Sequence, residues 1–209
     1  MKDLVNITDF WAAAPSGQAI YVGNVNVTSG GYWTTGNDGT VTAFTGEGTP
    51  ADNFIHYDAT NNVLTLHNAA IKESVHSDTS TYVEGAAIGV FNQNGAAELT
   101  IQLEGTNTIA EVSTGIYVLA FSNSTGDASL TIMGSGSLDA SGSRSGIQVH
   151  SNSSNATLSI ENAKVTATAS SPGDGVLVQS KNNSSVSLTV DGGTVDDGIK
   201  NSLGDSVKY

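Results

Sequence analysis

The sequence has no cysteine, few basic residues and no long apolar run, and each absence excludes a class of protein. Without Cys there is no disulfide framework, thiolate metal site, thiol nucleophile or iron–sulfur cluster. Only 7 residues are Lys or Arg against 20 Asp and Glu, and the net charge of -13 repels phosphate backbones and anionic lipid. No run reaches the about 18 apolar residues of a membrane-spanning helix. We therefore expect no nucleic-acid partner and no membrane insertion.

Helix-forming segments are also missing. Gly, Ser, Thr and Asn make up about 44% of the chain, a composition that often accompanies disorder. Hydrophobic residues still account for 38%, and they recur in short alternating bursts rather than at helical spacing. The pattern predicts an all-β protein with many short strands.

A three-strand unit is repeated from residue 87 onward. Its first strand reads Ala87–Val90, Gly115–Val118, Gly146–Val149 and Gly175–Val178. Its second strand reads Leu99–Ile101, Leu130–Ile132, Leu158–Ile160 and Leu188–Val190, and a weaker third strand is centred on Ile109, Leu138, Val165 and Val195. An earlier copy keeps Leu64–Leu66 and Ile71, so the second-strand leucines are separated by 35, 31, 28 and 30 residues.

This period predicts a parallel β-helix in which each unit forms one rung of three short strands and about 30 residues. Alternate side chains of a strand point to opposite faces, so the pairs Ile88/Val90 and Ile116/Val118 are expected to face the interior, with Gly89, Tyr117, Gln148 and Leu177 outside. We expect a right-handed helix, by analogy with large β-helices of this rung length. A β-sandwich or up-and-down barrel is the alternative, but it does not explain why every third strand matches.

The N-terminal region differs from the repeats in its aromatic content. Eight of the aromatic residues precede residue 58, and none lies between residues 122 and 208. We expect residues 1–55 to form a β-rich cap with hairpins, including a turn at Asn37–Gly39, that closes one end of the solenoid. Residues 56–209 are expected to form the solenoid itself, with a new rung starting near Ile199 and a short C-terminal cap at 203–207.

The β-helix architecture also occurs in polysaccharide-degrading enzymes, so we searched for their chemistry. A lyase base is usually Arg or Lys, but the single Arg and the scattered Lys residues form no pair at rung spacing. Glycoside hydrolysis needs two carboxyl groups, for which Asp191, Asp196 and Asp197 are the candidates. Turn carboxylates at a corner are the plainer interpretation of these three, and a weak Ca²⁺ site is the other alternative. The four His residues show no metal-ligand spacing, so no metal and no cofactor are expected.

Sugar binding remains as a function. Aromatic faces and the hydrogen bonds of Asn, Asp and Gln hold sugars, and the candidate aromatics are Trp11, Tyr32, Trp33 and Tyr117. The competing interpretation is that the tryptophans belong to the core of the cap, and their exposure decides between the two.

Two N-terminal segments also resemble modules of large secreted bacterial proteins: residues 21–28 followed by Gly31–Trp33, and residues 57–69. Such modules are often labelled carbohydrate-binding or have no assigned role, and the later rungs match the general pectin-lyase-like β-helix pattern. The resemblance implies an extracellular or cell-surface location, with any signal peptide removed, because residues 1–4 carry no apolar signal core. We expect a non-enzymatic module that contacts glycans or host surfaces; a β-helix hydrolase or lyase and a passive spacer are the alternatives.

Overall fold

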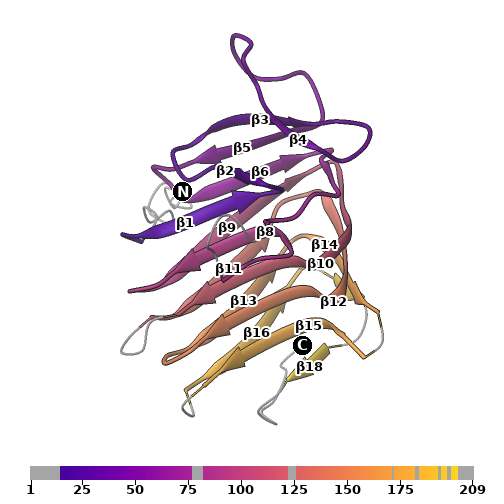
Figure 1. Ribbon diagram of the computed structural model, residues 1–209. Helices are drawn as coiled ribbons and strands as arrows, with labels where there is room; N and C mark the ends of the chain where they lie inside the picture. The colour runs from indigo at the N-terminus through magenta and orange to yellow at the C-terminus, as the bar shows by residue number, and fades with distance from the viewer. Residues whose placement is uncertain are drawn as a thin grey trace, which may run out of the picture.

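The computed structural model describes residues 15–76, 82–121, 126–170, 172–181, 184–192, 194–196 and 199–201 (Figure 1). All regular elements of these residues are β-strands, and no helix among them is long and apolar enough to cross a bilayer. Trp11, Asp197 and the expected C-terminal cap at 203–207 lie outside the described residues.

The strands stack into three parallel faces, as the repeat predicts. Face 1 contains β8 (Ala86–Asn92), the second half of β10 (Thr106–Ala120), the second half of β12 (Ser137–Ser151), β15 (Asp174–Ser180) and β18 (Ile199–Asn201). Face 2 contains β6 (Val63–His67), β9 (Ala97–Glu104), β11 (Ala128–Met133), β13 (Ala156–Glu161) and β16 (Val186–Asp191). Face 3 contains β7 (Ala70–Ile71), the first halves of β10 and β12, β14 (Lys164–Ala169) and β17 (Thr194–Asp196). The chain is thus an all-β parallel solenoid of about 3 turns with roughly 30 residues per turn.

The interior consists of aliphatic ladders whose members are register partners on successive rungs. On face 1 the ladder Ile88, Ile116, Ile147 and Val176 is fully buried. On face 2 the second-strand leucines Leu99, Leu130, Leu158 and Leu188 are direct partners. The predicted inward positions on both faces are confirmed, and β18 confirms the rung that begins near Ile199.

On face 3, the expected alignment of Ile109 with Leu138 is wrong. Ile109 stands opposite Ala140, and the partner of Leu138 is Asn107. Asn107 is only 1% exposed, and its side chain accepts a hydrogen bond from the Ala69 amide at 2.9 Å. The same side chain donates to the carbonyls of Glu104 at 3.1 Å and Ser137 at 3.2 Å. A buried amide therefore occupies the corner where an aliphatic side chain was expected, and it links three successive rungs.

The N-terminal strands add to the faces in antiparallel fashion. On face 1, β1 (Gln18–Val22) pairs with β8 and with β2 (Val25–Asn26). On face 2, β5 (Phe54–Asp58) pairs with β6 and with β3 (Gly31–Thr35), which continues through the turn at Asn37–Gly39 into β4 (Val41–Ala43). These strands lie at the upper end of the stack in Figure 1. Their inward side chains extend the hydrophobic core, and Trp33 is part of it.

Candidate functional site

Face 1 presents a row of side chains to the outside of the solenoid. Tyr21, Gly89, Tyr117, Gln148 and Leu177 are register partners on five adjacent strands. Because alternate residues of a strand point to opposite sides, this row lies opposite the buried Ile and Val ladders. Tyr117 is half-buried, so the outward row is partly covered rather than free in solvent.

The cover is the segment between β7 and β8, of which residues 72–76 and 82–85 are described. The Val75 amide donates to the Ala86 carbonyl at 2.9 Å, and the Gly85 amide donates to the Val75 carbonyl at 2.8 Å. Val75 and Val83 are buried, and with Ala86 and Leu119 they form a hydrophobic cluster separate from the solenoid core. The segment thus folds onto the outside of face 1.

Gly89 provides the space for this segment. A Cβ atom at position 89 would lie 2.7 Å from Val83 Cγ2 and 3.5 Å from Val75 Cγ2. On the following rungs the same outward position carries Tyr117, Gln148 and Leu177, so the strand itself accepts a side chain there. Glycine occurs where a second layer must approach the backbone.

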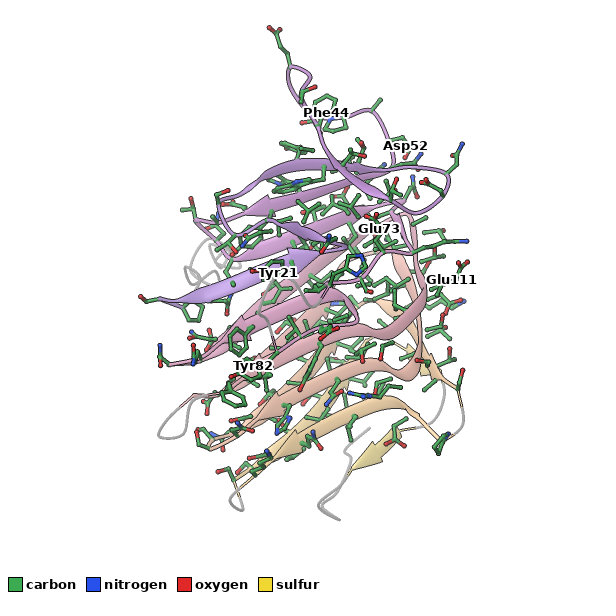
Figure 2. The ribbon with its side chains drawn as sticks, viewed as in Figure 1. Tyr21, Phe44, Asp52, Glu73, Tyr82 and Glu111 are labelled. Carbon is green, nitrogen blue, oxygen red and sulfur yellow. The ribbon has the colours of Figure 1, made fainter. Side chains whose placement is uncertain are left out.

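The segment carries Tyr82 to the surface beside two phenylalanines. The Tyr82 ring stacks on Phe121 with centroids 4.3 Å apart and an interplanar angle of 17°, and lies 5.1 Å from Phe91. Tyr82 is 51% exposed and is the exposed large hydrophobic residue of the described chain. Tyr21 and Tyr117 pack against the same cluster. Tyr82 and Tyr21 lie on the same side of the solenoid in Figure 2. We call these five residues the outer aromatic face: Tyr21, Tyr82, Phe91, Tyr117 and Phe121.

Polar side chains continue this surface on the next rungs. His150 and Gln179 follow Phe91 and Leu119 in register, and the Gln179 side-chain nitrogen donates to His150 Nδ1 at 3.0 Å. Burial, with a smaller contribution from the charge of Lys181, lowers the pKa of His150 from 6.5 to about 4. His150 is therefore neutral at physiological pH and carries its proton on Nε2, a buried atom with no hydrogen-bond partner in the described part of the chain.

A pocket of about 420 Å³ lies beside the outer aromatic face, at the corner where the strands of face 1 begin. Its wall includes Ser113, Ser143, Arg144, Ser145, Asp174 and Leu177, and we call it the Arg144 pocket. Burial raises the pKa of Tyr117 to about 12, and the nearby positive charge of Arg144 opposes this rise. Tyr117 therefore lies within electrostatic reach of Arg144. A second hollow of about 590 Å³, lined by Glu111, Ser141 and Thr168, shares Ser113 and Ser143 with the first.

The predicted cap aromatics have different positions. Trp33 is 6% exposed and packs in the solenoid core, and this burial argues against contact with a ligand. Tyr32 points outward from face 2 and stacks on His56, with ring centroids 4.1 Å apart and an interplanar angle of 16°. Next to it, Phe54 stacks on His67 at 4.7 Å. We call these four rings the cap aromatic row.

The candidate carboxylates Asp191 and Asp196 belong to strands on different faces of the solenoid. Asp191 is exposed on the outside of face 2, and its register partner is Glu161. Asp196 belongs to β17 on face 3, and Asp197 lies outside the described residues. Within the described ranges, no group of three or more His, Asp or Glu residues could hold a metal ion.

Tyr21, Tyr82, Phe91 and Phe121 were not predicted. Phe91 lies two residues beyond the outward Gly89, and continuing the alternation past the predicted strand end would have identified it. The same step on β10 reaches Leu119 and then Phe121. No repeat pattern covers the segment that carries Tyr82.

Comparisons with known proteins add no relative to this description: no protein-family model, curated protein or solved structure matches the chain.

Proposed function

We propose that the protein is a non-enzymatic, secreted or cell-surface β-solenoid module that binds glycans through its outer aromatic face. The observation that carries the proposal is the Tyr82–Phe91–Phe121 cluster, in which the ring of Tyr82 stays 51% exposed while it packs against two phenylalanines. A ring held in place by two others offers a preorganised flat face, and flat aromatic faces suit the C–H faces of sugars.

The surroundings of the cluster support a sugar rather than a protein partner. Gln179 is half-buried and provides an amide group next to the rings, whereas Gln148 and His150 are only 7% and 9% exposed. A polar group of this kind orients a sugar by its hydroxyls. The net charge of -13 gives long-range repulsion to anionic polymers, so uncharged glycans are the favoured class.

The cellular setting of the proposal rests on the resemblance of residues 21–33 and 57–69 to secreted bacterial modules. In that setting glycan binding would serve adhesion to a host or a polysaccharide surface. We also propose that the solenoid is related to the pectin-lyase-like β-helices. Its parallel rungs support this relationship, although no solved structure matches the chain.

A glycan array tests the proposal. The labelled protein is compared with Tyr82→Ala, which removes the exposed ring, and with Tyr32→Ala, a matched control in the cap aromatic row. We expect the wild type and Tyr32→Ala to bind the same glycans. Tyr82→Ala is expected to bind them about tenfold more weakly, which corresponds to about 1.4 kcal/mol.

Circular dichroism confirms that each variant is folded before the array is read. No binding by folded wild-type protein would contradict the proposal and favour a passive spacer. Loss of binding in Tyr32→Ala but not in Tyr82→Ala would move the site to the cap aromatic row.

A further inference from the structure

The Arg144 pocket joins the outer aromatic face. Leu177 lines the pocket and occupies the same outward row as Tyr117, two strands away. Neighbouring strands are about 4.8 Å apart, so the two side chains start about 10 Å from each other. A short oligosaccharide bound over Tyr117 therefore reaches the pocket.

Arg144 is the one cation among the residues that line the pocket. The ion pairs of the described residues are His67 with Asp52, His67 with Glu104, and Lys72 with Glu111. Arg144 belongs to none of them, is exposed, and is the single arginine of the sequence. A guanidinium group has five N–H donors and no acceptor.

The other side chains of the pocket complement these donors. Asp174, when ionised, only accepts hydrogen bonds, and Ser113 and Ser143 both donate and accept. Ser145 also lines the pocket, is 1% exposed, and has a hydroxyl oxygen with no hydrogen-bond partner among the described residues. Leu177 adds an apolar patch.

We infer that the Arg144 pocket is a specificity subsite of the same binding surface, which holds one uncharged sugar residue by a pair of neighbouring hydroxyls. This inference rests on the proposed glycan-binding function. A sugar hydroxyl donates and accepts at once, so one hydroxyl accepts from Arg144 while its neighbour donates to Asp174. A carboxylate or sulfate in the same place would satisfy Arg144 but would face the like charge of Asp174.

Isothermal titration calorimetry with short oligosaccharides of uncharged hexoses, and with the corresponding uronic-acid oligosaccharides, tests the inference. The variants are Arg144→Met and Asp174→Asn. Lys164→Met, an exposed lysine on β14 of face 3, is the charge-matched control. We expect the uncharged series to bind, each pocket variant to lower the affinity about tenfold or more, and the control to match the wild type. Binding is expected to change little with added salt.

The outcomes separate the subsite from the proposed function. If no oligosaccharide of either series binds wild-type protein, the glycan-binding function itself is contradicted. If Tyr82→Ala loses binding while Arg144→Met and Asp174→Asn retain it, the function stands and the subsite is wrong. Tighter, salt-sensitive binding of the uronic-acid series would show an anion site and overturn the assignment to an uncharged sugar.

Discussion

Replacing Gly89 tests how the outer aromatic face is assembled. The position is not in the left-handed region, and Leu177 occupies the equivalent place three rungs later, so the strand tolerates Gly89→Leu. The new side chain instead competes with Val83, whose Cγ2 atom would already lie 2.7 Å from its Cβ. We expect the segment between β7 and β8 to lift from face 1 in this variant.

The magnitude follows from the two valines that hold the segment down. Val75 is 1% and Val83 0% exposed, and burying such a side chain is worth about 1.5–3 kcal/mol, or about 3–6 kcal/mol for both. Gly89→Ala adds one methyl group, and overpacking of that size costs about 1–3 kcal/mol. The alanine variant is therefore expected to keep the segment in place. Leucine needs the volume that Val83 itself occupies and displaces it.

Hydrogen exchange measures the result at defined amides. Those of Val75 and Gly85 donate to backbone carbonyls at 2.9 and 2.8 Å in the native protein. In Gly89→Leu we expect both to exchange about 10²–10⁴-fold faster, the equivalent of about 3–6 kcal/mol, while Ile132 in β11 keeps its protection. Unchanged exchange at Val75 and Gly85 would refute this reasoning. Lost protection throughout the solenoid would show that the core, and not the segment, was disturbed.

Three further predictions concern stability. Ile147→Ala, at a 0% exposed ladder position, is expected to lower the free energy of unfolding in urea by about 2–5 kcal/mol, whereas Thr131→Ala on the outside of face 2 changes it by less than about 0.5 kcal/mol. Asn107→Ala leaves an amide and two carbonyls without their partner, and we expect a loss of about 1–3 kcal/mol; an unchanged urea midpoint would contradict the corner role of Asn107. Because the folded pKa of His150 is about 4 against 6.5, its contribution is complete above pH 6.5 and is lost as the pH falls towards 4. The stability difference between wild type and His150→Gln is expected to shrink over that window, and an NMR titration midpoint above pH 6 would be incompatible with it.

The faces of the solenoid were predictable because each strand alternates and each rung repeats. The buried Leu130 has equivalents at Leu99 and Leu158, so the same buried position occurs several times in the sequence. Agreement among copies identifies the register in a way that a single strand does not. This reasoning reaches as far as the repeat does.

Prediction from the repeat fails for segments that have no repeated equivalent and for positions where a polar side chain is buried. The pairing of β1 with β8, which brings Tyr21 beside Gly89, joins segments that share no repeat and are far apart in the chain. Apolar matching aligned Ile109 with Leu138, because hydrophobicity gives no reason to bury Asn107; its burial depends on three hydrogen bonds that exist only in the folded corner. The candidate site depends on both kinds of feature, and Tyr117 is the member that the pattern predicted.

NMR chemical-shift mapping, with the strongest uncharged oligosaccharide from the array, tests the central claim most directly. We predict that the perturbed signals belong to the outer aromatic face, led by Tyr82, Phe91 and Phe121, and extend through Tyr117 to Arg144. Perturbations confined to Tyr32 and His56 in the cap aromatic row, or to Glu161 and Asp191 on face 2, would contradict it.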